Sequence, residues 1–194
     1  MPTRTPYLEN ERGIPGTLLR SRRFAGRIRI DDRGNAIFPH FDADGLSGFE
    51  IKNQGFTGFS TGGTRALWTS HIQDGDNRIV FAESAIDALS HAASFPDQET
   101  RYASISGEPN LKQRELIRSE VAKMGPAGAV IAAFDADDCG RELTEVLRAA
   151  VALTGRSDLR FEIQTPEGRL KDFNDVLRQP RGVAADHGPK QSLG

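Results

Sequence analysis

The sequence of 194 residues is poor in cysteine and in long apolar runs. Its one cysteine, Cys139, excludes an internal disulfide and any zinc site built from several cysteines. No apolar stretch approaches the roughly 20 residues that cross a bilayer. The first residues, MPTRTPYLENERG, also lack the apolar core of a secretory signal. We therefore expect a cytoplasmic protein with no membrane partner.

The composition is ordinary for a globular protein, but its charge is unevenly distributed. Hydrophobic residues make up 37% and charged residues 27%, with a net charge of −2. Residues 1–35 hold eight arginines and four acidic residues, a net charge of +4 that leaves −6 for the remainder. Arginine suits bidentate contacts with phosphate. A basic lobe beside an acidic one fits an enzyme that holds a polyanion near metal-binding carboxylates, and a solvated surface with scattered ion pairs is the alternative.

The first part of the chain has the pattern of short strands and turns. Residues 27–53 alternate apolar and polar side chains and are interrupted by Asp-Arg-Gly-Asn and Asp-Gly turn sequences. The glycine-rich stretch 55–63, GFTGFSTGG, lacks the lysine of a phosphate-binding loop and is interpreted as turns or a mobile loop. Residues 1–77 are therefore expected to form a small, basic, β-rich (α+β) lobe.

After residue 77 strands and helices alternate. The patterns predict strands at 78–82, 101–106, 128–134 and 159–164, and helices at 84–94, 110–124 and 139–154. Such alternation predicts an α/β domain over 78–179, with a roughly four-stranded, mostly parallel sheet flanked by helices. Asn110 has the side chain and position of a helix N-cap. Residues 180–194 are polar, contain Gly and Pro, and are interpreted as a disordered tail.

Acidic side chains follow two of the predicted strands directly. Glu83 follows the strand 78–82, while Asp135 and Asp137 follow the buried run at 128–134. Ligands of open α/β sheets bind beyond the carboxyl ends of the strands, so these three carboxylates are expected to converge. Carboxylate oxygens suit Mg²⁺ or Mn²⁺. The alternative is that Asp137 and Asp138 only favour the N-terminus of the next helix through its dipole.

Three segments resemble the Toprim domain that bacterial primases, topoisomerases and some nucleases share. They are FAESAIDAL (81–89), SISGEPN (104–110) and FDADDCGRE (134–142). In this resemblance the motif residues are Glu83, Asp87, Gly107, Asp135, Asp137 and Gly140. The resemblance implies a Toprim-like α/β fold in which these acids form a catalytic site for Mg²⁺ or Mn²⁺, with Glu83, Asp135 and Asp137 as metal ligands. For Asp87 an ordinary helix N-terminal acid is an equal alternative.

Two positions depart from the family pattern. Ser84 stands where a glycine usually follows the glutamate, which would narrow the approach of the backbone. Cys139 stands where primases tend to have alanine, and a buried, inert thiol is expected there.

The resemblance continues on both sides of these motifs. Residues 168–179, GRLKDFNDVLRQ, are similar to an acidic segment of bacterial primases, in which Asp172 matches the first metal-binding acid and Asn174 occupies the place of the second. Asp175 is a substitute for that second acid, and a plain helix N-cap at Asp172 or Asn174 is the alternative. Upstream, residues 7–68 are more loosely similar to the N-terminal subdomain of the bacterial primase polymerase core. Lys52, Arg65 and Lys171 are candidates for phosphate contacts.

The implied activity is phosphoryl or nucleotidyl transfer on nucleic acid, with Glu83 as a ligand or general acid–base. A topoisomerase is disfavoured, because it needs a tyrosine nucleophile on a separate domain. Only Tyr7 and Tyr102 are present, Tyr102 lies in a predicted core strand, and the chain is short for such an enzyme. The upstream similarity favours a primase-like enzyme of plasmid or mobile-element DNA replication or transfer. A metal-dependent nuclease and a non-catalytic module that binds single-stranded DNA are the alternatives.

The partners implied by this resemblance are single-stranded DNA and nucleoside triphosphates. Because one cysteine cannot build the zinc module by which primases read a template, a zinc-module protein, a helicase or a relaxase is an expected protein partner. The four histidines show no metal-ligand spacing and are interpreted as structural or surface residues.

Overall fold

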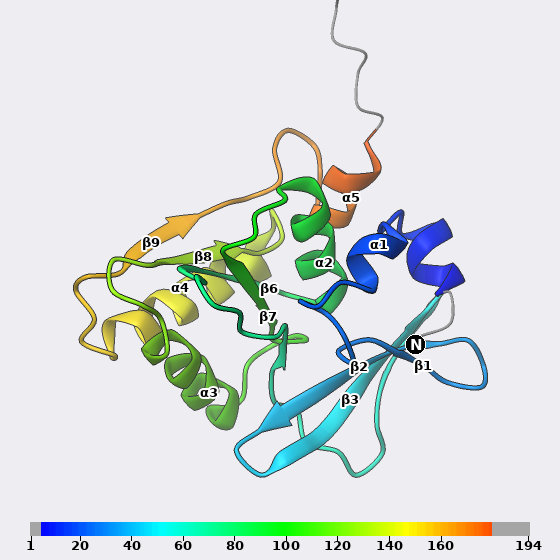
Figure 1. Cartoon of the computed structure of the whole chain (residues 1–194), viewed down its shortest axis with the longest axis horizontal. Coiled ribbons are helices and arrows are strands. Elements are labelled where there is room, and N and C mark those ends of the chain that lie inside the picture. The colour runs from blue at the N-terminus through cyan, green and yellow to red at the C-terminus, as the bar shows by residue number, and fades with distance from the viewer. Residues whose placement is uncertain (1–4, 180–194) are drawn as a thin grey trace, which may run out of the picture.

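The computed structural model describes residues 5–179, so the predicted tail at 180–194 lies outside the described residues. Two sheets dominate the fold (Figure 1). The first is antiparallel and contains, in spatial order, β1 (Arg29–Ile30), β2 (Ala36–Asp42), β3 (Gly45–Asn53) and β4 (Phe56–Phe59). The presence of β4 shows that the interpretation of residues 55–63 as turns or a mobile loop was wrong for Phe56–Phe59, which pair with β3.

The second sheet has five strands, one more than the sequence pattern predicts. Four of them are parallel to one another: β6 (Arg78–Ala82), β7 (Thr100–Ser104), β8 (Ala129–Ala133) and β9 (Arg160–Ile163). The added strand, β5 (Trp68–Thr69), is antiparallel to β7, and the spatial order is β5-β7-β6-β8-β9. Two residues carry too little periodicity to predict a strand, so only the pairing with β7 defines β5.

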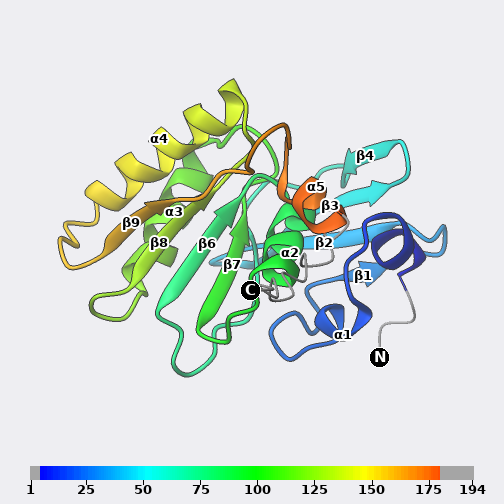
Figure 2. The same ribbon diagram turned by 90° about the horizontal axis from the view of Figure 1, so that it is seen from above.

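Helices cover both faces of this sheet (Figure 2). They are α2 (Ala85–Ser94), α3 (Leu111–Ala122), α4 (Asp138–Ala152) and α5 (Phe173–Arg178), and the first part of the chain adds the single-turn π-helix η1 (Tyr7–Glu11) and α1 (Gly16–Leu19). Val80 and Ile131 face α2 and the first part of the chain, whereas Ile79 and Val130 face α3 and α4. Burial on both faces explains why β6 and β8 are continuous apolar runs rather than alternating ones.

The helix starts follow sequence signals. Asn110 caps α3 in a reciprocal capping box with Gln113, as its position predicts. Ser84 caps α2, Asp137 caps α4 and Asp172 caps α5, each by accepting a hydrogen bond from a backbone N–H three residues later. Among the described residues no helix is both long and apolar enough to span a membrane.

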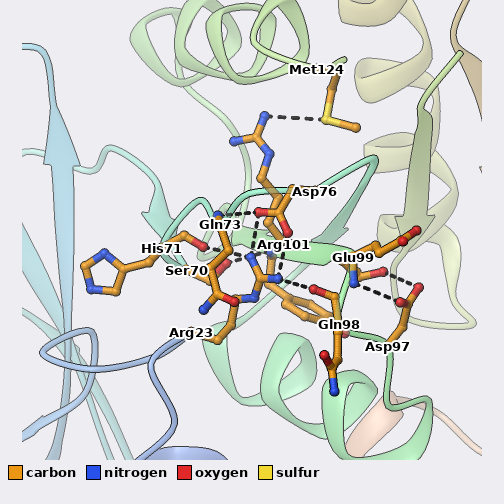
Figure 3. A network of polar contacts seen from close by, with 12 residues as sticks. Arg23, Ser70, His71, Gln73, Asp76, Asp97, Gln98, Glu99, Arg101 and Met124 are labelled. Carbon is orange, nitrogen blue, oxygen red and sulfur yellow. Dashed lines mark hydrogen bonds and ion pairs between the residues drawn. The ribbon is translucent and has the colours of Figure 1, made fainter. Parts of the chain in front are cut away.

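The first part of the chain is attached to the second sheet by an apolar core and by a buried arginine (Figure 3). Phe24 stacks on Trp68 at a centroid separation of 5.9 Å, within a core that α2 shares. Arg23 forms a bidentate pair with Asp76, with both N–O distances 2.6 Å, and donates to the carbonyl oxygens of His71 and Gln98. Because Asp76 and Gln98 precede β6 and β7, Arg23 ties the arginine-rich segment to the amino ends of two core strands. The boundaries predicted at residues 77 and 179 remain predictions.

Candidate functional site

The candidate site lies at the carboxyl ends of β6, β7 and β8, where the sequence analysis expects it. Glu83 follows β6 and Asp135 follows β8, and β6 pairs with both neighbouring strands. The Ser106 N–H donates to the Glu83 carbonyl oxygen at 2.7 Å, so the loop after β7 supports the peptide of Glu83. Ser106 and Gly107 have φ values of 59° and 100°, and this left-handed turn directs the Ser106 N–H to Glu83.

Gly140 fixes the course of the chain around Asp135. A Cβ atom at residue 140 would overlap the Asp135 carbonyl oxygen and crowd the Asp135 nitrogen and carbonyl carbon. Only glycine therefore lets the first turn of α4 approach the end of β8 this closely. The Asp137 carboxylate accepts from the Gly140 N–H at 3.0 Å through Oδ1, so Asp137 does cap the helix as the alternative proposes. Its other carboxylate oxygen, Oδ2, takes no part in that hydrogen bond and lies 3.9 Å from Lys171 Nζ.

Ser84 does not disturb the site, although it replaces the family's glycine. Its φ and ψ of −122° and 162° are extended values that any residue adopts. Its hydroxyl caps α2 and donates to Asp87 Oδ2. Serine thus serves as both helix cap and partner of the buried Asp87.

The loop before α5 brings Asp172 to the same region. The Ala136 N–H, between the two aspartates of the motif, donates to the Lys171 carbonyl oxygen at 2.9 Å. α5 packs against α2, which carries Asp87. Asp172 Oδ1 accepts from the Asp175 N–H at 2.7 Å. Five carboxylates from different parts of the sequence therefore interact electrostatically: Glu83, Asp87, Asp135, Asp137 and Asp172.

Burial and mutual repulsion raise the pKa of three of these carboxylates, those of Glu83, Asp87 and Asp135. Burial, followed by the charges of Asp87 and Glu83, raises the pKa of Asp135 to about 7. Burial raises the pKa of Asp87 to about 6, against the opposing effect of the Ser84 hydrogen bond. The pKa of Glu83 is raised by burial and then by Asp137, while Lys171 and Lys52 oppose the shift. Among the described residues the nearby lysines do not offset burial and repulsion, since all three pKa values stay raised.

The donor set fits a hard divalent cation. Within residues 5–179 no three His, Cys, Asp or Glu side chains already lie close enough together to hold a metal ion. However, Glu83 Oε2 and Asp135 Oδ1 are buried atoms with no hydrogen-bond partner. Buried carboxylate oxygens are normally satisfied, and oxygen is the ligand that Mg²⁺ and Mn²⁺ prefer. A cation would supply the missing partner for both atoms.

The three candidate phosphate-binding residues lie around these acids. Lys171 Nζ is near Asp137 Oδ2, as given above, and its side chain is 67% exposed. Lys52 on β3 pairs with Glu50 at 3.0 Å, and its charge also reaches Glu83 and Asp87. The Arg65 guanidinium lies over the Phe59 ring and within about 4 Å of where a Gly107 Cβ would stand. Residues from both parts of the chain therefore border the acids.

Asn174 and Asp175 have structural partners of their own. Asn174 is 2% exposed and donates to the Arg12 carbonyl oxygen at 2.8 Å and to Ser90 Oγ at 3.0 Å. It joins α5 to α2 and to the segment after η1. Asp175 Oδ2 accepts from the Lys171 N–H at 3.2 Å. Asn174 thus replaces a family acid with a side chain that holds α5 in place.

The expectation of a buried thiol was wrong. Cys139 is exposed, because it lies in the first turn of α4 on the side away from the core. Burial of its sulfur and the nearby carboxylates raise the pKa of this thiol, which disfavours the reactive thiolate.

Sequence reasoning did not identify the polar cluster behind Glu83. The Ser106 hydroxyl lies 3.2 Å from His40 Nε2 and 3.1 Å from Glu50 Oε2, and all three residues are buried. His40 and Glu50 belong to β2 and β3, so the cluster couples the first sheet to the loop that supports Glu83. The sequence carries no signal for it, because its members are separated by up to 66 residues.

Comparison with known proteins gives two family matches and several relatives. The family described as Toprim-like matches residues 80–177, slightly more than half of the chain. A family described as a protein of unknown function, DUF3991, matches residues 6–77. A "65 kDa protein" of Zymomonas mobilis subsp. mobilis is 32% identical over 183 residues, which covers 86% of this chain. The chain spans only 30% of the length of that relative.

Two solved structures are similar in fold. The primase fragment of the bacteriophage T7 primase–helicase protein has a TM-score of 0.57 and 18% identity, with 86% of this chain and 66% of that chain covered. A bacteriophage T7 assembly of lagging-strand DNA polymerase with primase domains bound to an RNA/DNA hybrid and dTTP has a TM-score of 0.52 and 18% identity. The coverage in that case is 86% of this chain and 81% of the other.

Proposed function

Because this chain belongs to the Toprim-like family, we propose that it is a Mg²⁺- or Mn²⁺-dependent nucleotidyltransferase of the primase type. Its fold is of the primase and Toprim type, which suggests a role in nucleic-acid metabolism. The proposed substrates are single-stranded DNA and nucleoside triphosphates, in plasmid or mobile-element replication or transfer. The T7 neighbour that is bound to an RNA/DNA hybrid and dTTP supports this substrate class.

One observation carries the proposal. Glu83 and Asp135 reach the same end of neighbouring strands, and each has a buried carboxylate oxygen without a partner. A purely structural site would satisfy these atoms with backbone N–H groups, as happens for Asp137 and Asp172. Unsatisfied, mutually repelling carboxylates destabilise the protein, so their presence supports a role in binding and catalysis.

In the proposed mechanism Asp135 and Asp137 would hold the cation, with Glu83 as a further ligand or as the general acid–base, and Asp172 would border a second position. When bound, Mg²⁺ supplies neutralisation of the phosphate charge and of the charge that develops on the reacting oxygens. In the general acid–base role Glu83, not coordinated to the metal, would accept the proton of the attacking hydroxyl, which suits a carboxylate whose pKa burial raises. Lys52 and Lys171, whose charges both act on Glu83, would hold phosphate oxygens, and Asp87 accepts a hydrogen bond from the Ser84 hydroxyl that caps α2.

The test incubates the protein with labelled single-stranded DNA, nucleoside triphosphates and Mg²⁺ or Mn²⁺. We expect extended products that disappear with Glu83→Gln or Asp135→Asn, with losses of at least about 100-fold. Asp138→Asn is the matched control, because the exposed Asp138 pairs with Arg141 at the surface of the same helix turn. Shortened products would favour a nuclease instead. A gel shift without turnover would favour a non-catalytic module that binds single-stranded DNA.

The protein partners remain part of the proposal. A helicase, a relaxase or a zinc-module protein would deliver the template, since the single cysteine provides no zinc module within this chain.

A further inference from the structure

A cavity of about 580 Å³ lies between α3, the end of β2 and the edge strand β5. Its apolar walls come from Phe41, Leu67, Ile72 and Leu116. Glu120, in its lining, contacts Arg101 at the amino end of β7. The acids of the candidate site follow β6 and β8, which β7 separates from the edge strand β5, and none of them lines the cavity, so it is separate from the proposed active site.

The cavity has an excess of positive charge. The Glu120 carboxylate pairs with Arg101 and with Lys123, and the charge of Arg27 also reaches it. Three cations therefore face one carboxylate. The other acid in the lining, Asp42, is already neutralised by Lys112 at 2.6 Å. The lining itself holds two bases, Arg27 and Lys123, and two acids, Asp42 and Glu120. Because Arg101 and Lys112 already pair with these acids from outside the lining, the charges of Arg27 and Lys123 are in excess at the cavity.

Arg27 is held in position without a hydrogen-bond acceptor for its Nε atom. Its guanidinium lies 4.7 Å from the centroid of the Phe41 ring, and Nε is buried and unpartnered among the described residues. The Arg27 backbone is fixed independently, because its carbonyl oxygen accepts from Trp68 Nε1 at 2.7 Å. The Arg27 side chain is thus fixed at the cavity, and a bound anion would compensate the charge of its guanidinium.

We propose that this cavity binds a small phosphate monoester. The phosphate dianion matches the two uncompensated charges and accepts from Arg27 and Lys123, since guanidinium and ammonium groups both bind phosphate well. Thr69, Ser70 and Ser119 add hydroxyl groups to the lining. The organic part of the ligand packs against Phe41, Leu67 and Leu116, and the volume lies within the range of small-molecule sites.

Titration calorimetry in EDTA at low salt tests the proposal, with inorganic phosphate, AMP and adenosine as probes. The proposal predicts that both phosphates bind and raise the melting temperature, that AMP binds more tightly because of the apolar walls, and that adenosine does not bind. Arg27→Gln and Lys123→Gln should each weaken phosphate binding by roughly 10-fold or more. Without divalent cations the proposed catalytic reaction is absent, so this result is independent of the proposed function.

Arg148→Gln is the matched control, because Arg148 also lies over a phenylalanine ring, Phe161, at 4.5 Å but lines no part of this cavity. It should bind the probes as the parent does. Ligand-free Arg27→Gln should melt at the same temperature as the parent or higher, since an unpaired, partly buried charge is removed. The proposal is overturned if millimolar phosphate and AMP leave the parent unchanged, or if Arg27→Gln binds them as well as the parent. If Arg27→Gln melts at a lower temperature than the parent and binds the probes equally well, Arg27 has a packing role only.

Discussion

Gly140 determines, as a single residue, where the carboxylate of Asp135 stands. We predict that Gly140→Ala destabilises the protein by about 2–3 kcal/mol, because the new methyl group overlaps the backbone of Asp135 and must displace it. The displaced Asp135 should also lose its contribution to metal binding. Gly125→Ala is the control, since a Cβ atom there meets nothing within 4 Å and Gly125 does not have a positive φ. Urea unfolding of both variants compares the two outcomes, and equal stabilities would contradict the close approach.

The charge of Asp135 makes stability depend on pH. Its pKa is about 7 in the folded protein and about 3.9 in an unfolded chain, so between these values the folded state keeps a proton that the unfolded state releases. The free energy of unfolding should therefore fall as the pH rises from about 4 to about 7. In EDTA at pH 8, Asp135→Asn should be more stable than the parent by on the order of 1 kcal/mol, or ~3 °C. At pH 4 the two proteins should melt together.

Metal should reverse this dependence. Because a cation binds the deprotonated carboxylate, the rise in melting temperature caused by Mg²⁺ or Mn²⁺ should increase from pH 6 to pH 8. Asp135→Asn should lose the rise, whereas Asp138→Asn should keep it. A parent whose melting curve is unchanged by millimolar metal at pH 8 would refute the assignment of Asp135 as a ligand.

Among the structural elements, the buried Arg23 determines how the arginine-rich segment joins the second sheet (Figure 3). The side chains of Arg23 and Asp76 are 9% and 4% exposed, and Arg23 also satisfies two carbonyl oxygens. Arg23→Met should cost about 3–5 kcal/mol, because it leaves a buried carboxylate without its counterion. Arg22→Met, at the exposed neighbouring position, should change stability by less than about 0.5 kcal/mol. Thermal unfolding measures both variants, and a similar loss in the two would contradict this role.

At the scale of the whole molecule, the charge count of the first 35 residues overstates the charge that is free to bind a polyanion. Arg23 is buried with Asp76, Arg12 donates to Tyr7 and Asn174, and Arg20 pairs with Glu9. We predict that residues 1–35 and the lobe up to Trp68 form one wall of a nucleic-acid groove onto which the acids open. This wall depends on the remaining arginines and on Lys52, Arg65 and Lys171. Affinity for single-stranded DNA should fall steeply with salt.

Lys171 provides the most direct test of that groove, since its exposed side chain lies beside the acids. Lys171→Gln should weaken DNA binding and reduce the slope of log affinity against log salt by roughly one. Lys112→Gln is the control, because Lys112 pairs with Asp42 and its charge does not influence Glu83, Asp87 or Asp135. Fluorescence anisotropy across a salt series measures both slopes. Affinity that is absent at low salt, or independent of salt, would refute the groove.

The sequence by itself determined the features that depend on local spacing. The positions of β6, α2, β8 and α4 follow from apolar periodicity and from caps such as Asn110. The meeting of Glu83 with Asp135 also follows, because the carboxyl ends of parallel neighbouring strands share one edge of a sheet.

Only the tertiary structure decided features that depend on partners far away in the chain. The short β5 exists through pairing with β7, and Asn174 is explained by its contacts with Arg12 and Ser90. The support of Glu83 by Ser106 requires two strands of the other sheet. Burial and the charges of distant residues also raise the pKa of Asp135. The packing of the whole chain decides that Cys139 is exposed and that charged residues meet at the cavity beside Arg27. A pattern of neighbouring residues does not encode these features, because burial and electrostatic interactions depend on distances in space rather than along the chain.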